Sequence, residues 1–402
     1  MTEATIRPWL RMMAVALPVL MLASCGSTTV RSTSHEEVVV AAEEIPEEQL
    51  LDIGIGLFDP GLEEDEADED PGISPRIRRA EARYMPYQLM ETLQGTGNWG
   101  IVRVIPERQS EADIWVDAEI LQSDGLTTAL LVTVTDSSGA RWYQEKYTGT
   151  VSKYAYDNAL SHGSEPFQGL YNDIANDLLE YYQNLSPEAI AELRTITELR
   201  FARRFSPEAF DQHLGTDRDG ELYVRRLPAE NDPVLMRVRQ VRERDYMFVD
   251  TLQEHYGSFV RQMDVPYLEW RKAYYEEGQA LREVEAQSNR RLVGGALAVL
   301  AGILAQGSDS STVRTAGAVG IGAGAGVFVS GLNKREEAKV HAEALDEITA
   351  SMDSEMEPHT IQLQERTVTL SGSVNDQYEQ WREVLREMYT TETGQTGASG
   401  SP

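Results

Sequence analysis

The chain of 402 residues contains a single cysteine, Cys25. A chain with one cysteine forms no internal disulfide, so its fold must be stabilised by packing alone. The length allows two or three domains, and the apolar fraction of 41% is ordinary for a globular protein. We therefore expect a packed hydrophobic core of considerable size.

The residues before Cys25 have the three parts of a secretory signal. Arg7 and Arg11 form a basic start, residues 12–22 form an apolar run, and small residues follow. The run is too short for a stable membrane span. We expect cleavage before Cys25 and export of the remaining chain, with an incidental buried cysteine as the alternative.

The sequence Leu22-Ala23-Ser24-Cys25 resembles the lipobox of bacterial lipoproteins. The resemblance implies that Cys25 is acylated and becomes the new N-terminus, so that a lipid bilayer is one partner of the chain. Two or three acyl chains together make such an attachment long-lived. Residue 26 is glycine and not the aspartate of inner-membrane retention, which by the same resemblance implies the periplasmic face of the outer membrane.

The formal net charge of −30 excludes two classes of partner. Nucleic acids and anionic lipid surfaces both bind positively charged protein surfaces. A chain with so large a negative charge is repelled by them overall. We expect no nucleic-acid binding and interpret the acidity mainly as solubility.

The pattern of apolar residues predicts an α+β fold. Residues 50–58, 99–105, 112–120, 126–135 and 141–147 have the character of strands, the last three of an antiparallel meander, and residues 74–93 and 167–181 have helical spacing. The acidic run 63–70 is a solvated insert by this interpretation, with divalent-cation binding as the alternative.

The predicted organisation is a signal peptide at 1–24, a lipidated tether at 25–48, an α/β domain at 49–185, a helical region at 186–289, a glycine-rich hairpin at 290–335, a return helix at 336–357, a strand-helix unit at 358–390 and a disordered tail at 391–402.

The order of elements in residues 50–183, including the strand DIWVDAEIL, resembles the small α/β domain of envelope lipoproteins of the curli-channel and TolB N-terminal type. That resemblance implies a domain that binds protein partners or assembles into rings, without catalytic residues.

The helical region carries recognisable boundaries. Ser186 and Ser206 each precede a proline, the pattern of an N-cap serine, and Gly215 suits a helix end. The sequence Asp-Arg-Asp-Gly at 217–220 predicts a hairpin turn. Residues 233–263 and 267–287 have apolar residues at helical spacing, so we expect two long amphipathic helices with a break near Pro266.

Residues 292–332 consist of two uncharged segments of small residues, separated by a polar turn and bracketed by basic residues. Glycines are costly in a helix, about 1 kcal/mol each relative to alanine, unless close backbone packing offsets the loss. The segments are shorter than the ~20 residues of a comfortable bilayer crossing. We predict a helical hairpin that contacts membrane or sister subunits through Gly294, Gly295, Gly302, Gly317, Gly320, Gly322, Gly324 and Gly326.

This repeated Gly-x-Gly-x-Gly pattern resembles the glycine-zipper regions of bacterial outer-membrane proteins. The alternative is an intramolecular helical hairpin packed under the α/β domain. Further along the chain, the sequence VTLSGSV at 368–374 and the amphipathic helix after it resemble half of a BON domain, which implies association with phospholipid membranes.

The sequence contains none of the common catalytic motifs, neither a Gly-x-Ser-x-Gly elbow nor His-Glu-x-x-His nor a phosphate-binding loop. His162 is the one histidine worth testing as a base, and an exposed loop histidine is the simpler interpretation. We predict no enzymatic activity, no cofactor and no metal.

Three hypotheses for the function follow from these patterns. The first is a non-enzymatic outer-membrane lipoprotein whose α/β domain binds an envelope partner or a second copy of the chain. The second is a subunit of an oligomeric secretion or transport channel built from the glycine-rich hairpins. The third is a periplasmic hydrolase that uses carboxylates.

Overall fold

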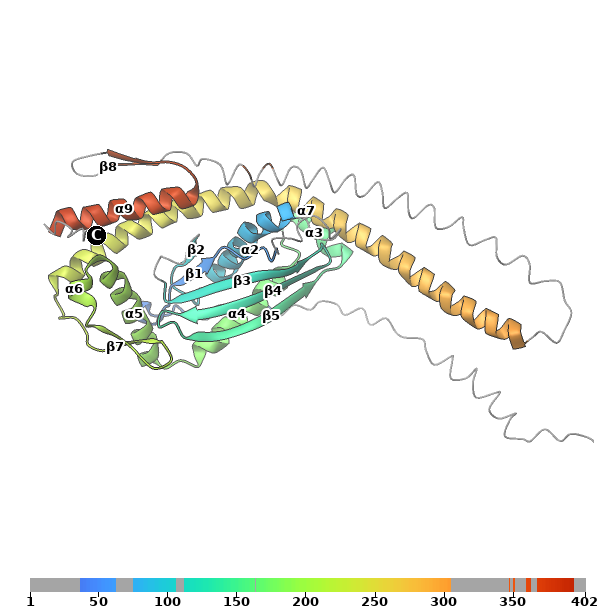
Figure 1. Cartoon of the computed structure of the whole chain (residues 1–402), viewed down its shortest axis with the longest axis horizontal. Coiled ribbons are helices and arrows are strands. Elements are labelled where there is room, and N and C mark those ends of the chain that lie inside the picture. The colour runs from blue at the N-terminus through green and yellow to red at the C-terminus, as the bar shows by residue number, and fades with distance from the viewer. Residues whose placement is uncertain are drawn as a thin grey trace, which may run out of the picture. The chain divides into compact units, whose positions relative to one another are not determined.

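The computed structural model describes residues 37–62, 75–105, 112–162, 164–304, 347, 350, 359–362 and 367–393. Within these ranges the chain forms a mixed five-stranded sheet, two small two-stranded sheets and seven α-helices, which is the α+β class predicted from the sequence (Figure 1). Several predicted features lie outside the described residues: Cys25, the acidic run 63–70, most of the return helix at 336–357, residues 394–402, Gly317, Gly320, Gly322, Gly324 and Gly326.

The five-stranded sheet has the strand order β2-β1-β3-β4-β5. Strand β1 is parallel to both of its neighbours, with Ile53 opposite Val102 on β2 and Ile114 on β3. Strands β3, β4 and β5 follow one another in the chain and pair antiparallel. The bounds of the strands are β1 Ile53–Gly56, β2 Val102–Ile105, β3 Ile114–Ser123, β4 Thr127–Asp136 and β5 Arg141–Thr150.

Two helices, α2 (Pro75–Thr96) and α4 (Gln168–Gln183), supply the apolar side chains that pack against the sheet in the main core. Side chains on alternate positions of the strands point into this core, among them Ile55, Val116 and Val132, which are fully buried. This period-two alternation is what makes one face of such a sheet apolar.

Residues expected to form a loop through His162 are instead the helix α3 (Lys153–His162). Its apolar face is short, since Tyr156 and Ala159 are buried while Tyr154 is exposed. The ring of Tyr156 lies 5.7 Å from that of Tyr275 on a distant helix. The apolar residues of α3 recur too irregularly along the chain for a helical period to be recognised from the sequence.

The helical region begins with α5 (Pro187–Phe205), and Ser186 caps it as predicted, because its hydroxyl accepts the Ala189 amide at 3.2 Å. Ser206 precedes α6 (Pro207–Phe210) without a side-chain cap. The prediction that Gly215 ends a helix was wrong. Gly215 pairs with Tyr223 between β6 (Leu214–Thr216) and β7 (Leu222–Val224), and the Tyr223 ring occupies the space that a Cβ would need. The predicted turn at 217–220 joins these strands.

The expected break near Pro266 is absent, because α7 is one helix from Pro233 to Leu304, 72 residues long. A proline inside a helix costs about 3 kcal/mol through a lost hydrogen bond and a steric clash. Met263, Tyr267 and Trp270 are all buried in the main core around Pro266. Tertiary packing on both sides of the proline therefore holds the helix together.

Helix α7 also covers the outer edge of the sheet. The Gln253 side chain accepts the Val104 amide at 2.9 Å and donates to the Val104 carbonyl at 2.8 Å, as a neighbouring strand would. One residue earlier on β2, Arg103 forms an ion pair with Asp250 at 2.8 Å. An unpaired strand edge invites association with other chains, and α7 closes the edge at β2.

The C-terminal part contains β8 (His359–Gln362), β9 (Thr367–Leu370) and α9 (Val374–Thr393). The two strands pair antiparallel, in the region where a strand and a turn were predicted. Helix α9 packs against α7, where Phe248 contacts the rings of Tyr378 and Trp381. The main core thus includes residues from β1 through α9.

Candidate functional site

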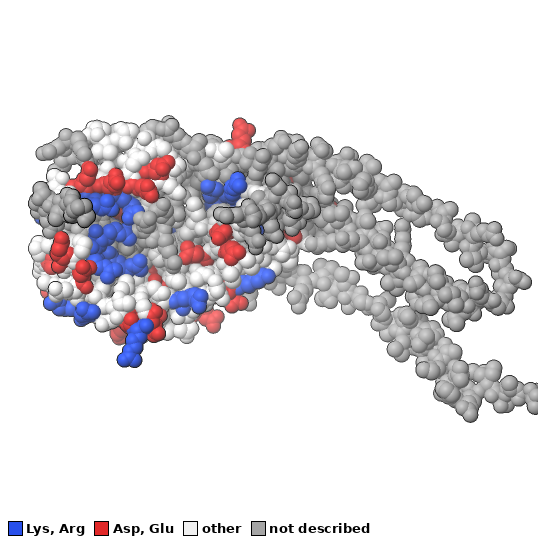
Figure 2. Space-filling view, viewed as in Figure 1, with Lys and Arg blue, Asp and Glu red and all other residues white. Residues whose placement is uncertain are grey.

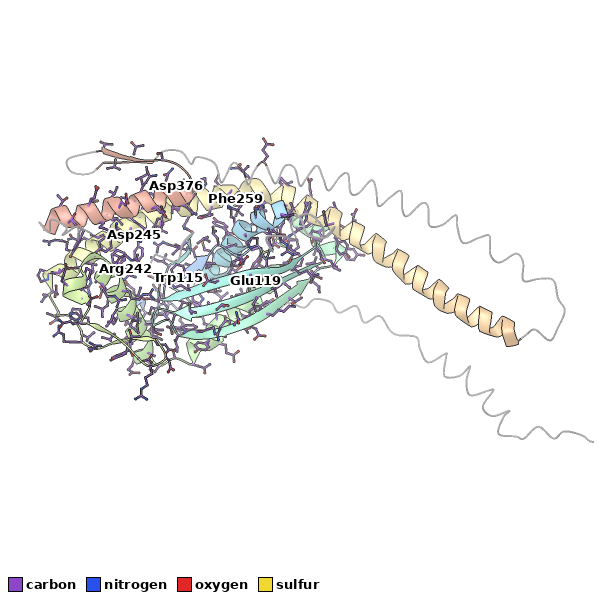
Figure 3. All side chains as sticks on the ribbon, viewed as in Figure 1. Trp115, Glu119, Arg242, Asp245, Phe259 and Asp376 are labelled. Atoms are coloured by element: carbon purple, nitrogen blue, oxygen red, sulfur yellow. The ribbon has the colours of Figure 1, made fainter. Side chains whose placement is uncertain are left out.

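A cavity of about 720 Å³, lined by both polar and apolar residues, lies where the start of α7 meets α5 and the N-terminal ends of β1 and β2. We call it the α7 groove. On the face shown in Figure 2, Lys and Arg side chains gather in one cluster bordered by acidic side chains, at the end of the molecule where Figure 3 labels Arg242. The groove is lined by Glu47, Leu50, Asp52, Trp99, Gly100, Ile101, Asp113, Arg194, Thr195, Glu198, Arg239, Arg242, Glu243 and Tyr246.

Two carboxylates meet at the floor of the α7 groove. Asp113 is 4% exposed and accepts the Thr197 hydroxyl at 2.5 Å and the Asp52 amide at 2.9 Å. Asp52 in turn accepts the Ile101 amide at 2.8 Å. Burial, and then the charge of Asp52, raises the pKa of Asp113 above its ordinary value. Both aspartates are therefore held in place by the backbone at the entrance to the sheet.

An arginine-tyrosine stack forms the α7 side of the groove. The guanidinium of Arg242 lies 5.1 Å from the centroid of the Tyr246 ring, and that of Arg103 lies 4.5 Å from the same ring. Burial lowers the pKa of Arg242, but Tyr246, Asp113 and Asp52 outweigh it and the net shift is upward. Burial raises the pKa of Tyr246 to about 12. Arg242 thus stays charged and Tyr246 neutral.

Three polar atoms of the lining that carry a hydrogen are buried and have no hydrogen-bond partner among the described residues. They are Nε1 of Trp99, a residue that is 5% exposed, Nε of Arg242 and the hydroxyl of Tyr246. Buried donors are nearly always satisfied in folded proteins, so unsatisfied ones beside a cavity indicate a place where a ligand or water supplies the acceptor.

The other two arginines of the groove already have partners. Arg239 forms a two-point contact with Glu198, at 2.5 and 3.1 Å, and the guanidinium of Arg194 donates to the Glu47 carbonyl. These pairs join α5 to α7 and to the short helix η1 (Glu47–Gln49). The arrangement provides fixed donors and acceptors around a cavity and is suited to binding a polar ligand.

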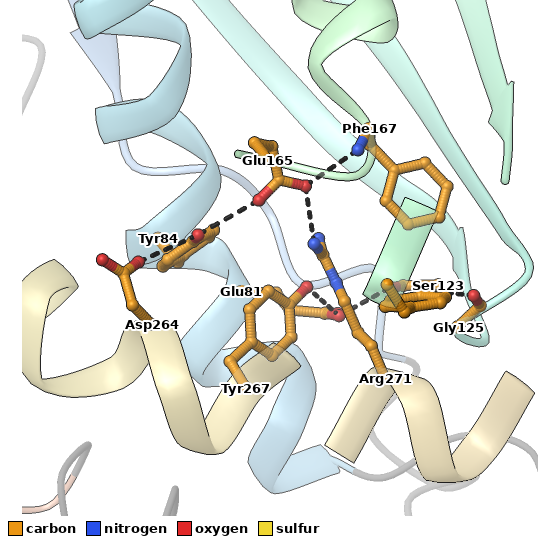
Figure 4. Close-up of polar contacts among 10 residues, drawn as sticks. Glu81, Tyr84, Ser123, Gly125, Glu165, Phe167, Asp264, Tyr267 and Arg271 are labelled. Atoms are coloured by element: carbon orange, nitrogen blue, oxygen red, sulfur yellow. Dashed lines mark hydrogen bonds and ion pairs between the residues drawn. The ribbon is translucent and has the colours of Figure 1, made fainter. Parts of the chain in front are cut away.

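A second polar cluster on α7 is enclosed and serves as a contrast to the groove (Figure 4). Arg271 forms an ion pair with Glu165 at 2.6 Å, with side chains 0% and 4% exposed, and its guanidinium lies 3.9 Å from the centroid of the Tyr267 ring. Glu81 accepts hydrogen bonds from Ser123 at 2.5 Å and from Tyr267 at 2.7 Å. We call these five residues the α7 anchor, because they tie α7 to α2 and to the strands.

Burial raises the pKa of Glu81, and Arg78, the two hydrogen bonds and Arg271 oppose the shift. Tyr84 extends the anchor, since its hydroxyl lies 3.1 Å from carboxylate oxygens of both Glu165 and Asp264. The contacts of the anchor join elements of the fold to one another.

The residues that the sequence singled out do not meet in this groove. Gly294, Gly295 and Gly302 lie on the last turns of α7, and the other predicted contact glycines and Cys25 lie outside the described residues. His162 is the last residue of α3. Within the described ranges, no three histidine, cysteine or acidic residues are grouped as metal ligands. In the same ranges no helix has the length and apolar character to span a bilayer.

Comparisons with family models, with curated proteins and with solved structures found no match to this chain. The interpretation of the α7 groove therefore rests on its own geometry.

Sequence reasoning missed the groove because its parts are far apart in the chain. Asp52 and Asp113 are 61 positions apart, and Arg242 comes from a different helix. Asp113 fitted the polar positions of an alternating strand, which predict an exposed side chain. The only local signal was Trp99, a large aromatic residue between glycines at 97 and 100.

Proposed function

We propose that this chain is a lipid-anchored, non-enzymatic envelope lipoprotein at the periplasmic face of the outer membrane, where it binds an envelope protein partner. The observation that carries the proposal is the sole cysteine, Cys25, at the lipobox position after an export signal. Acyl chains on Cys25 hold the folded part close to a bilayer, so its binding surfaces act on neighbours there.

The continuity of α7 supports a second contact with membrane or sister subunits. At a rise of 1.5 Å per residue, Gly302 is about 40 Å along the helix from Tyr275, a residue of the folded core. Figure 1 shows this C-terminal part of α7 running past the strands. In our proposal the glycine-rich segment continues α7 into a helical hairpin, while the antiparallel meander β3–β5 belongs to the partner-binding part.

The groove also favours binding over catalysis. The two carboxylates at its floor, Asp52 and Asp113, are engaged by backbone and hydroxyl donors. Its unpartnered nitrogen donors belong to Trp99 and Arg242, whose indole and guanidinium protons do not leave at neutral pH, and burial raises the pKa of the Tyr246 hydroxyl to about 12, so this group also keeps its proton. Such groups recognise a ligand without transferring a proton to it.

Mass spectrometry of the protein purified from its own envelope tests the anchor. We expect an N-terminal peptide that begins at Cys25 and carries fatty acids. The Cys25→Ser variant should remain unprocessed and unlipidated. An uncut N-terminus, or a free thiol at Cys25 in native material, contradicts the proposal.

Vesicle flotation of a protein that begins at Gly26, and so lacks both the signal peptide and the lipidated cysteine, tests the glycine-rich contact. We expect association with phospholipid vesicles, or a defined oligomer in detergent, that is lost in the Gly320→Leu/Gly324→Leu double variant. The Gly320→Ala/Gly324→Ala variant is the matched control, because alanine preserves the small surface. A monomer that ignores vesicles in all three forms contradicts this part, and a large ring-like oligomer would favour the channel hypothesis.

A further inference from the structure

We infer that the α7 groove binds a short, extended peptide segment of the envelope partner that carries a basic side chain. The inference rests on the proposed function, since it names the part of a protein partner that the groove recognises. A cavity of about 720 Å³ is in the size range of small-ligand sites and admits a few residues of an extended chain, not a folded domain.

The hydrogen-bonding groups of the groove match those of a peptide bond. Nε1 of Trp99, Nε of Arg242 and the hydroxyl of Tyr246 are buried and have no partner among the described residues, and the main-chain carbonyls of a bound peptide would supply acceptors for such donors. Asp52 and Asp113 line the same cavity, and their carboxylates accept hydrogen bonds. An amide presents an acceptor and a donor side by side, as this lining requires.

The charge of the lining selects a basic ligand over an acidic one. The groove has five carboxylates, Glu47, Asp52, Asp113, Glu198 and Glu243, and three arginines, Arg194, Arg239 and Arg242. Since Arg239 is paired with Glu198, four carboxylates face two remaining arginines. A lysine or arginine side chain compensates part of this excess, and the net charge of −30 attracts basic segments over a longer range.

The rim of the groove offers apolar contact for a neighbouring residue of the peptide. Ile101 is 42% exposed, and Leu50 and Trp99 line the same cavity. An apolar residue next to the basic one therefore finds a surface to cover. The combination of amide-matched donors, excess carboxylates and an apolar rim describes a peptide with a basic and an apolar residue in sequence.

Calorimetric titration with two synthetic peptides tests this inference on the lipidated full-length protein in detergent. The probes are acetyl-Ala-Lys-Leu-Ala-amide and acetyl-Ala-Glu-Leu-Ala-amide, which differ only in the charged residue. We expect the lysine peptide to bind at least about tenfold more tightly than the glutamate peptide. In a ¹⁵N–¹H spectrum, the lysine peptide should shift the Trp99 indole signal, which is identified by its loss in the Trp99→Phe variant.

Two variants test whether the peptide binds in the groove. Asp52→Asn keeps the oxygen that accepts the Ile101 amide but removes a negative charge, and Trp99→Phe removes the indole donor without changing the charge of the groove. Each should weaken the lysine peptide about tenfold. Arg261→Gln replaces an exposed arginine on α7 outside the lining and should leave the affinity unchanged.

Equal binding of the two peptides, an unmoved Trp99 signal at millimolar peptide, or equal affinity in all variants overturns the inference. Mass spectrometry of the same preparation separates the two ideas. A protein acylated at Cys25 that binds neither peptide overturns the peptide site alone, and an unacylated native protein that binds the lysine peptide overturns the anchor alone.

Discussion

Two arginines of α7, Arg242 in the α7 groove and Arg271 in the α7 anchor, have opposite surroundings on the same helix. Arg271 is fully buried, pairs with Glu165 at 2.6 Å and lies against the ring of Tyr267. Arg242 has no ion pair within 4.0 Å among the described residues. Its Nε atom lacks an acceptor there, as do Nε and Nη2 of Arg271, so the ion pair is what distinguishes the two arginines. Asp113 and Asp52 are the carboxylates whose charges raise the pKa of Arg242, and both accept hydrogen bonds from backbone or hydroxyl groups instead of pairing with it.

The difference separates a structural use of buried charge from a binding use. In the anchor, the charge of Arg271 is offset by Glu165 inside the chain, although Nε and Nη2 of Arg271 have no acceptor among the described residues, and removing one partner of the ion pair leaves the other unpaired. In the groove the charges are held apart around a cavity, so part of their interaction is left for a ligand. Variants of the two arginines should therefore affect stability very differently.

The largest effect should come from Arg271→Met. This change leaves Glu165 buried without its cation, and such losses cost about 3–5 kcal/mol. Urea unfolding followed by circular dichroism measures the free energy of unfolding. Lys272→Met is the control on the next residue: Lys272 pairs with Asp157 at 2.7 Å, but the side chains are 30% and 50% exposed, so the loss should be under about 1 kcal/mol. Equal losses in both variants would remove the distinction between buried and exposed pairs.

Asp245 tests how much an incompletely matched charge costs on α7. It is buried and accepts a hydrogen bond from the Trp381 indole at 3.2 Å, and burial raises its pKa to about 6. A carboxyl with a raised pKa binds its proton more tightly when folded, so its stabilising contribution is lost as pH rises from about 4 through about 6. Between about pH 4 and pH 7 the Asp245→Asn variant should gain about 2–3 kcal/mol of stability relative to wild type.

Unfolding free energies of the Asp245→Asn variant and wild type across that pH range provide the measurement. Asparagine keeps an oxygen for the Trp381 indole, so packing of α9 should survive the change. Parallel curves for the two proteins would contradict a raised pKa at Asp245.

Gly125 sharpens the comparison from the side of the sheet. It has φ +72° in the turn between β3 and β4, and an added Cβ would contact the Arg271 carbonyl on α7. Gly125→Ala should cost about 1–3 kcal/mol through steric overlap, in addition to backbone strain. Gly139→Ala is the matched control, because Gly139 has φ +95° and open space around its Cβ position. If Gly125→Ala and Gly139→Ala lower the thermal unfolding temperature equally, the contact with α7 adds nothing to the cost at Gly125.

The smallest stability effect should come from Arg242→Gln. This arginine forms no ion pair in the described residues, and its stacking on Tyr246 is worth about 0.5–1 kcal/mol. The variant should therefore lose under about 1 kcal/mol in the same urea experiment. A loss as large as that of Arg271→Met would show that Arg242 is structural and would break the comparison.

The strands of the main sheet were predictable because each carries its own pattern. Alternation at Ile114, Val116 and Ala118 and the turn glycines after β3 and β4 are local features. The continuity of α7 was not predictable, because the packing that offsets Pro266 involves residues of other elements. Helix α3 was missed for a related reason, since its contact with Tyr275 is invisible in the sequence.

The two polar clusters were beyond sequence reasoning for a different physical reason. Glu81 and Arg271 looked like charges on the solvated faces of amphipathic helices, which is where most charged residues lie. Both are fully buried, and only the fold brings Ser123, Glu165 and Tyr267 beside them. The identity of a charged residue in a helix does not indicate whether another element of the fold supplies an oppositely charged or hydrogen-bonding partner.

Since α7 is continuous through Pro266, Arg242 and Gly302 lie on one helix, about 90 Å apart along its axis. The α7 groove and the first glycines of the proposed contact segment therefore share one stretch of helical backbone, so a change that interrupts α7 between them would separate the two binding regions that we propose.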